Sequence, residues 1–296
     1  MRNDAAMLPF LVGLFAIALL TGMDGLIKSL APHYSAAQIS FMRSIMLVFW
    51  MVPVALVTRP GWPQPGRLKA HALRAALMVV TTITFFYALG KMPLAELFAL
   101  AMTAPLFIAL FSALFLREKV RPMLMLALAF GFMGMLVVVY NGGGGFAGGE
   151  ISGLALASAL LSPVAYALGI VLLRSQANQE SPILIVLVQG ILLTLFLSPL
   201  AALDFAVIAS PIDFGKFAAI GLLAATGHLC ITYTLSRIAA PRFAVLEYTG
   251  LLWAAGFGYI FFGEIPTLSV WLGAGLIIIG CALVMRVREK VPPATA

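Results

Sequence analysis

Long apolar stretches separated by short polar segments follow one another along the whole chain. A helix needs about 20 mostly apolar residues to cross the hydrocarbon core of a bilayer. The stretches that approach this length lie at residues 8–30, 36–57, 70–90, 94–116, 122–140, 151–173, 182–202, 215–236, 243–263 and 268–285. We therefore expect an all-α integral membrane protein with ten transmembrane helices.

The second half of this pattern repeats the first. Residues 85–138 align without a gap on residues 231–284 when they are moved forward by 146 positions, so that Tyr87 falls on Tyr233. Five helices per repeat is an odd number, and the second repeat therefore starts on the opposite side of the membrane. Internal repeats of this kind are typical of secondary transporters, whose substrate sites lie between the repeats. We expect two inverted five-helix repeats around a central cavity.

Glycine and proline mark the boundaries of these units. The glycine-rich segment after the fifth predicted helix has the composition of a flexible linker. The predicted units are a first repeat, a linker, a second repeat and a tail, at residues 1–140, 141–150, 151–290 and 291–296. Pro53, Pro105 and Pro163 fall within predicted spans, where each removes a backbone hydrogen bond and kinks its helix.

The composition is that of a chain surrounded by lipid, with 62% hydrophobic and only 10% charged residues. Soluble domains carry roughly 25% charged residues. The net charge of +7 does not indicate a nucleic-acid partner, because the basic residues lie in short runs between apolar stretches instead of along one face. The two cysteines, Cys230 and Cys281, form no metal-binding spacing. We expect a lipid bilayer and a small-molecule substrate as partners, and no cofactor or metal.

The distribution of lysine and arginine predicts the orientation, because these residues are enriched on the cytoplasmic side. An amino terminus in the cytoplasm places there Arg2, Arg59, Arg67, Lys69, Arg74, Arg117, Lys119, Arg121, Arg174, Arg237, Arg242, Arg286, Arg288 and Lys290. Lys28, Lys91 and Lys216 then fall near the outer ends. We expect both termini to be cytoplasmic.

Four ionisable residues lie at similar depth in the outer half of the predicted bundle: Asp24, Lys28, Arg43 and Glu96. Ionisable groups within a span are costly, by about 2.5 kcal/mol or more at a helix centre, and are functional candidates for that reason. One interpretation is an outer gate or anion site in which Arg43 binds a substrate carboxylate. The other is a structural ion pair between Arg43 and Asp24 or Glu96, and the two interpretations overlap because gates are often ion pairs that break.

The inner half offers His228 in the eighth predicted helix and Glu247 in the ninth, at comparable depth. A buried histidine and glutamate can exchange protons and couple transport to a proton gradient, which makes the proton a further candidate partner. A structural hydrogen bond between the two side chains fits the sequence at least as well.

Aromatic residues supply the other candidate substrate surface, notably Tyr87, Tyr233, Tyr248 and Trp253. A cavity lined with rings and a few polar groups suits small amphipathic molecules. Aromatic side chains in spans more often serve packing or the membrane interface. Threonines beside the two matched tyrosines are able to bind a ligand or a neighbouring helix.

Glu118 and Glu264 are repeat-related and each ends the fourth predicted helix of its repeat. A carboxylate there is able to cap the amino end of the next helix, so we assign both a structural role, together with Pro105. Glycines in the last two spans allow close helix packing within the chain. The same glycines are candidates for the interface of a homo-oligomer, and the sequence does not decide between the two roles. No G-x-S-x-G, H-E-x-x-H or Walker motif occurs, and no catalytic residue is assigned.

Each half of the chain carries its own ordered set of short motifs. The first half carries Gly22 to Lys28, Arg43, Phe85 to Leu89, Pro105 and Leu116 to Glu118, and the second carries Tyr233 to Ser236, Phe262 to Glu264, Gly273 and Gly280. In this set the chain resembles the EamA-type proteins of the bacterial drug/metabolite transporter superfamily, which contain two EamA repeats. Leu251 and Gln189 depart from the pattern, since they stand at the positions matched by Pro105 and Arg43.

The resemblance implies a ten-helix basket with a central cavity, and carriage of small metabolites, often export of amino acids or related compounds. We expect a secondary transporter of a bacterial inner membrane that exports an amino acid, an amino-acid derivative or a similar amphipathic compound by alternating access. The alternative is an importer of a nutrient such as a vitamin or nucleoside-like compound. The third hypothesis is a non-transport membrane scaffold or enzyme. It would require a catalytic cluster in a span or a large soluble domain, and the sequence contains neither.

Overall fold

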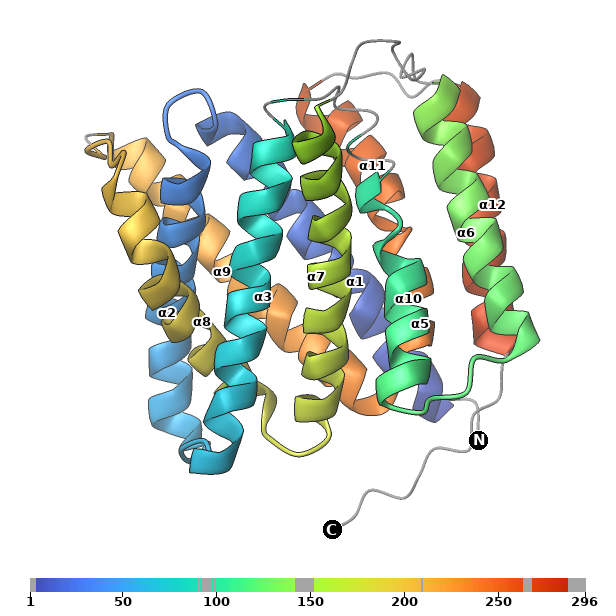
Figure 1. Cartoon of the computed structure of the whole chain (residues 1–296), viewed down its shortest axis with the longest axis horizontal. Coiled ribbons are helices and arrows are strands. Elements are labelled where there is room, and N and C mark those ends of the chain that lie inside the picture. The colour runs from blue at the N-terminus through green and yellow to red at the C-terminus, as the bar shows by residue number, and fades with distance from the viewer. Residues whose placement is uncertain are drawn as a thin grey trace.

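The computed structural model describes residues 4–89, 91, 97, 100–141, 152–208, 210–262 and 268–286, and every regular element in this part of the chain is an α-helix (Figure 1). The helices are α1 (Asp4–Leu30), α2 (Ala36–Thr58), α3 (Pro65–Leu89), α5 (Ala104–Phe115), α6 (Pro122–Asn141), α7 (Gly153–Ala177), α8 (Pro182–Ala202), α9 (Pro211–Arg237), α10 (Ala240–Glu247), α11 (Gly250–Phe262) and α12 (Leu268–Arg286). The all-α prediction is confirmed for these residues. The predicted linker from residue 142 onward and the predicted tail lie outside them.

Seven of the described helices are long and apolar enough to cross a membrane: α1, α2, α3, α7, α8, α9 and α12. Two shorter apolar helices are α5 and the greater part of α6. Large apolar side chains such as Phe49, Leu56 and Trp271 are exposed along the bundle, as lipid contact requires. The chain is therefore a multi-pass membrane protein.

The helix beginnings follow from local sequence. The side chains of Ser35, Ser181 and Ser210 accept hydrogen bonds from backbone N–H groups in the first turns of α2, α8 and α9. Proline at the first helical position of α8 and α9 lacks a backbone N–H at a place where none is needed. Pro53 and Pro163 lie inside α2 and α7, within the spans predicted for them.

The ninth predicted span is not one continuous helix. It is divided into α10 and α11 by a turn at Tyr248 and Thr249. The hydroxyl of Thr249 donates to the carbonyl of Leu246 at 2.6 Å. A threonine hydroxyl that bonds to the backbone in this way competes with the regular helical pattern.

The same turn occurs 146 residues earlier, at Met102 and Thr103. There Thr103 donates to the carbonyl of Leu100, also at 2.6 Å. Pro105 follows this turn in the first two residues of α5, so it begins a helix instead of kinking one. The second turn forms with Leu251 at the position matched by Pro105, so proline is not required for the break.

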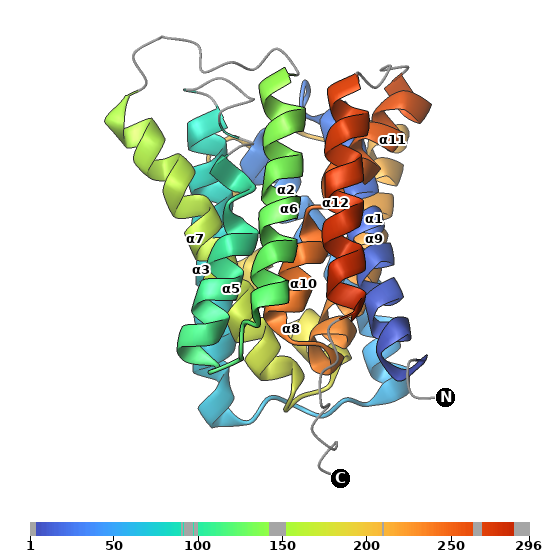
Figure 2. The ribbon, with the colours of Figure 1, turned by 90° about the vertical axis from the view of Figure 1, so that its right-hand side faces the viewer.

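Helices from the two halves of the chain pack against each other throughout the bundle. The closest pairs are α1 with α9, α3 with α7, α2 with α8 and α6 with α12. Glycine permits several of these contacts: a β-carbon at Gly221 of α9 would lie 2.6 Å from the Met46 backbone of α2, and one at Gly134 of α6 would lie 2.7 Å from the carbonyl of Gly273 in α12. The first residues of α1 and the last residues of α12 lie at the same end of the bundle (Figure 2).

Candidate functional site

Six ionisable side chains from six helices form a polar centre inside this apolar bundle. They are Asp24 of α1, Arg43 of α2, Arg74 of α3, Tyr166 of α7, His228 of α9 and Glu247 of α10. Electrostatic interactions connect them into one group: Arg43 with Asp24 and His228, Arg74 with His228, and Tyr166 with Glu247 and Asp24. The polar centre therefore joins elements from both halves of the chain.

Asp24 and Arg43 carry opposite charges and have no direct partner within the described residues. Asp24 is exposed and Arg43 is half-buried. They attract each other, but no hydrogen bond or direct ion pair connects either one to another described side chain. A direct ion pair between the two is thus not present in this structure, and Glu96, the other predicted partner of Arg43, lies outside the described residues.

Glu247 is bound by a tyrosine from the neighbouring helix. Tyr166 of α7 donates from its hydroxyl to Glu247 Oε1 at 2.6 Å. His228 interacts with Arg43 and Arg74, and not with Glu247. The structure, which describes both residues, therefore contains no hydrogen bond between His228 and Glu247. Proton coupling stays a prediction.

The broken helix brings backbone polar groups close to these side chains. Glu247 is the last residue of α10, directly before the turn at Tyr248 and Thr249. The ends of interrupted helices carry backbone groups that lack helical partners and partial charges that attract ions or polar ligands. Interrupted helices of this kind form substrate sites in several transporter folds.

The aromatic candidates do not gather at the polar centre. Tyr248 is fully buried, and its ring occupies the space where a β-carbon at Gly131 of α6 would stand, 2.3 Å from Tyr248 Cδ2. It has no surface for a substrate in this conformation. Tyr87 and Tyr233 lie near the last residues of α3 and α9, which are at opposite ends of the bundle (Figure 1).

Two further aromatic contacts are local. The guanidinium of Arg237 lies 5.0 Å from the centre of the Tyr233 ring, one turn away on the same helix. Trp253 stacks with Phe257 along α11, with 6.4 Å between ring centres, and is 38% exposed. These positions fit helix packing and the membrane interface at least as well as substrate contact.

The threonines beside the matched tyrosines use their hydroxyls within the protein. Thr81, Thr82, Thr84 and Thr232 each donate to a carbonyl in the preceding turn of their own helix. Thr234 donates instead to the carbonyl of Pro9 in α1, at 3.1 Å. Of the remaining site predictions, Lys28 is exposed in the last turn of α1, and Glu264 lies outside the described residues.

Glu118 connects the two halves of the chain. Its carboxylate accepts hydrogen bonds from the Ser112 hydroxyl at 2.5 Å, from Arg174 Nε of α7 at 2.8 Å, and from the backbone N–H of Ala240 at 2.9 Å. Ala240 is the first residue of α10, so the carboxylate lies at the positive end of that helix. The helix that it caps belongs to the other half of the chain and is not the next helix in sequence.

Sequence reasoning missed two members of the polar centre. Arg74 was assigned to the cytoplasmic flank, although it lies nine residues after Pro65, the first residue of α3. Nine residues correspond to about 14 Å of helix, which is well inside a span. Tyr166 is an aromatic residue within a predicted span, and no spacing in the sequence links it to Glu247, which is 81 residues away.

A multi-pass helical fold that holds a group of ionisable side chains within its spans is typical of membrane transporters. The chain belongs to the EamA-like transporter family, whose sequence profile matches it twice, at residues 7–140 and 153–286. This finding confirms the resemblance drawn from the sequence motifs. It also confirms the two EamA repeats on which that resemblance rested.

Similar proteins of known role are also transporters. The pseudopaline exporter CntI of Pseudomonas aeruginosa is 32% identical over 273 residues, which cover 90% of this chain and 92% of that protein. A riboflavin transporter of Brucella anthropi is 27% identical over 253 residues, covering 82% and 88%. A crystal structure of another protein aligns with a TM-score of 0.82 over 96% of both chains at 19% identity, which shows a shared fold.

Proposed function

We propose that this protein is a secondary transporter of a bacterial inner membrane that exports a small zwitterionic metabolite, an amino acid or a related compound. Transport proceeds by alternating access between two inverted repeats of five transmembrane helices each, ten in total. The polar centre is the substrate site, and both termini are cytoplasmic.

The observation that carries this proposal is the pair of opposite charges, Asp24 and Arg43, that attract each other without a direct contact. Unpaired charges within a span are costly, by about 2.5 kcal/mol or more at a helix centre, so their retention indicates a function. A zwitterion supplies a partner for each: its carboxylate binds the Arg43 guanidinium through two parallel hydrogen bonds, and its ammonium group binds Asp24. Asp24 is exposed and Arg43 is only half-buried, so both side chains keep surface that a ligand can reach.

The matched helix breaks support the inverted repeat. The two turns lie 146 residues apart and contain the same threonine-to-carbonyl hydrogen bond, so both halves carry the same local structure. Helices α3 and α9, which are related by the same shift, run in opposite directions through the bundle (Figure 1). Inverted repeats can exchange conformations, which is the structural basis of alternating access.

The basic residues support the orientation. The end at which α1 begins and α12 finishes also contains the α2–α3 and α5–α6 connections (Figures 1 and 2). These connections carry Arg59, Arg117, Lys119 and Arg121. Since lysine and arginine are enriched on the cytoplasmic side, this end faces the cytoplasm.

Export is favoured because the exporter is the more similar of the two kinds of relative, at 32% identity against 27% for the riboflavin transporter. Import of a nutrient is the second candidate, supported by the riboflavin transporters. Glu247 is the residue proposed to carry a coupled proton, since it lies at the helix break within the polar centre and accepts a hydrogen bond from a neutral tyrosine, Tyr166.

The test uses inside-out membrane vesicles and a panel of radiolabelled amino acids and derivatives. Export in the cell corresponds to uptake by these vesicles, which we expect for the unaltered protein. Arg43→Ala should lower this uptake by at least about tenfold, because the carboxylate loses a charge-assisted pair of hydrogen bonds. The matched control is Lys119→Ala, which removes a positive charge from an exposed connection and should leave uptake unchanged.

Normal uptake by Arg43→Ala vesicles would remove Arg43 from the substrate site. Uptake only by right-side-out vesicles would favour the importer. No transport in either orientation, for any member of a panel that includes amino acids, vitamins and nucleosides, would contradict the proposed substrate classes.

A further inference from the structure

Two groups of contacts lie at opposite ends of the bundle (Figure 1). The first, here the first latch, joins the turn between α7 and α8 to the beginning of α3 and consists of Arg67, His71, Arg74, Gln179 and Glu180. The second latch joins the turn between α1 and α2 to the beginning of α9 and consists of Tyr34, Asp213 and Phe217. Helices α3 and α9 begin at opposite ends of the bundle (Figure 1).

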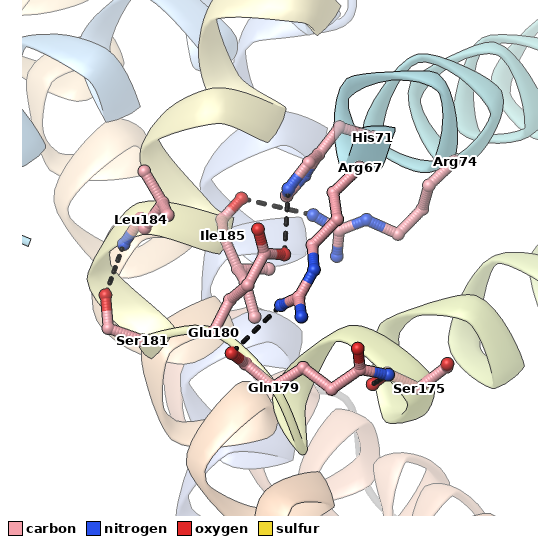
Figure 3. Close-up of polar contacts among 9 residues, drawn as sticks. All are labelled: Arg67, His71, Arg74, Ser175, Gln179, Glu180, Ser181, Leu184 and Ile185. Carbon is pink, nitrogen blue, oxygen red and sulfur yellow. Dashed lines mark hydrogen bonds and ion pairs between the residues drawn. The ribbon is translucent and has the colours of Figure 1, made fainter. Parts of the chain in front are cut away.

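The first latch combines a buried pair, His71 and Glu180, with an exposed contact between Arg67 and Gln179 (Figure 3). His71 Nε2 and Glu180 Oε2 lie 3.0 Å apart, with side chains that are 0% and 5% exposed. Arg67 donates to the carbonyl of Gln179 at 3.0 Å, and Arg74 donates to the carbonyl of Ile185 at 3.1 Å. Arg67, His71 and Arg74 thus all connect α3 to the turn between α7 and α8 or to the first residues of α8.

The second latch has the same layout with different chemistry. Tyr34 donates from its hydroxyl to Asp213 Oδ2 at 3.0 Å, and its ring meets Phe217 edge-on with 5.3 Å between ring centres. Burial raises the pKa of the Tyr34 hydroxyl, and the hydrogen bond and charge of Asp213 raise it further. The hydroxyl therefore stays protonated at neutral pH and remains a donor.

The repeat relates the two latches residue by residue. Moving forward by 146 positions takes Tyr34 to Glu180, Arg67 to Asp213 and His71 to Phe217. The side chain at the first of these positions contacts the third in both latches, as Glu180 with His71 and as Tyr34 with Phe217. Ser35 and Ser181, the next residues in sequence, cap the helices that follow in the same way. Equivalent positions thus make equivalent contacts at opposite ends.

Several buried polar atoms in and beside the first latch lack a hydrogen-bond partner within the part of the chain that the structure describes. Among the described residues, His71 Nδ1, Arg74 Nε and both amide atoms of Gln176 are buried without a hydrogen-bond partner. Gln176 also lines a pocket of about 80 Å³ together with Arg67, Ala70, Ser175, Gln179 and Glu180. Unpaired buried polar atoms oppose closure. These unpaired atoms lower the free energy that the contacts of the first latch contribute.

We propose that the two latches are the paired gates of the transporter, of which the first must open for access from the cytoplasm and the second for access from outside. This inference rests on the proposed function, because it assumes that a path through the polar centre reaches both faces. It assigns gating to residues outside the substrate site, with the exception of Arg74, which belongs to both the first latch and the polar centre. Weakening one latch should therefore favour access from its own face.

The experiment measures which face of the membrane reaches the polar centre. A reporter cysteine replaces His228 in a chain in which Cys230 and Cys281 are replaced by alanine. A membrane-impermeant maleimide is applied to right-side-out and to inside-out vesicles, and the ratio of cytoplasmic to outer labelling rates is measured. The control is Thr58→Ala, which removes an exposed hydrogen bond within α2 and should leave the ratio unchanged.

Glu180→Gln should raise the ratio of cytoplasmic to outer labelling by about tenfold, since it weakens a buried charge-assisted hydrogen bond. Tyr34→Phe should lower the same ratio by about threefold. Asp213→Asn weakens the same bond from the other side and should shift the ratio in the direction of Tyr34→Phe. Opposite shifts by the two latches are the signature of paired gates, which a merely structural role does not produce.

Shifts in the same direction, or ratios equal to that of the parent in folded variants, would overturn the gating assignment. If the proposed function is wrong, the result differs: the unaltered protein does not transport the substrate, or the parent with the reporter cysteine is labelled from one face only. Transport and two-sided labelling of the parent together with unshifted ratios would reject the latches alone.

Discussion

Loss of the Glu118 carboxylate should destabilise the connection between the two halves of the chain. Glu118→Ala removes the cap of α10, which costs about 0.5–2 kcal/mol, and the charge-assisted bond to Arg174, which contributes about 1.5–3 kcal/mol. Arg174 keeps its hydrogen bonds to Asn178 Oδ1 and to the carbonyl of Leu235, so part of its donor capacity stays satisfied. We expect a net loss of about 3 kcal/mol in the free energy of unfolding.

The assay is equilibrium unfolding in mixed micelles with an increasing fraction of sodium dodecyl sulfate, followed by circular dichroism. Glu118→Gln keeps an acceptor for the Ala240 N–H and should lose only about 1 kcal/mol. The double variant with Arg174→Met should lose less than the sum of the single variants, with a coupling of about 1–2 kcal/mol. Lys119→Ala, at the neighbouring exposed residue, is the matched control. A free energy for Glu118→Ala within about 0.5 kcal/mol of the unaltered protein would refute the reasoning.

Three further outcomes are expected. Gly131→Ala should lower the melting temperature, because overpacking against the buried Tyr248 ring costs about 1–3 kcal/mol, and Tyr248→Leu should restore it; an unchanged melting temperature for Gly131→Ala would contradict the close contact. Tyr248→Phe should be neutral or stabilising, since the hydroxyl has no hydrogen-bond partner among the described residues, and a clear loss of stability would point to a bound partner. Glu247→Gln should make substrate flux in vesicles independent of an imposed pH gradient while downhill flux continues; a retained pH dependence would remove Glu247 as the proton carrier.

The long helices were predictable from the sequence because length and hydrophobicity alone identify a membrane span. The ends of α2, α8 and α12 lie within one residue of the predicted spans at both ends. The helix breaks were not predictable in this way. The residues that follow Thr249 are almost all apolar, as in an unbroken span. A single threonine hydroxyl that bonds to a carbonyl does not change this hydrophobic pattern.

Depth in the membrane was a useful but incomplete guide to the site. Asp24 and Arg43 were expected at the same level, and the structure places them within electrostatic range. His228 and Glu247 were also expected at one level, yet Glu247 binds Tyr166. Depth along a helix axis does not fix the direction in which a side chain points, so partners on different helices cannot be assigned from spacing alone.

The most direct test of the account is whether one site between the two halves is reached from both faces and binds the substrate. The reporter cysteine at position 228, in the cysteine-free background, is labelled from each face with and without a transported substrate. We expect labelling from both faces and protection by the substrate on both. Labelling from one face only, or equal labelling with and without substrate, would contradict it.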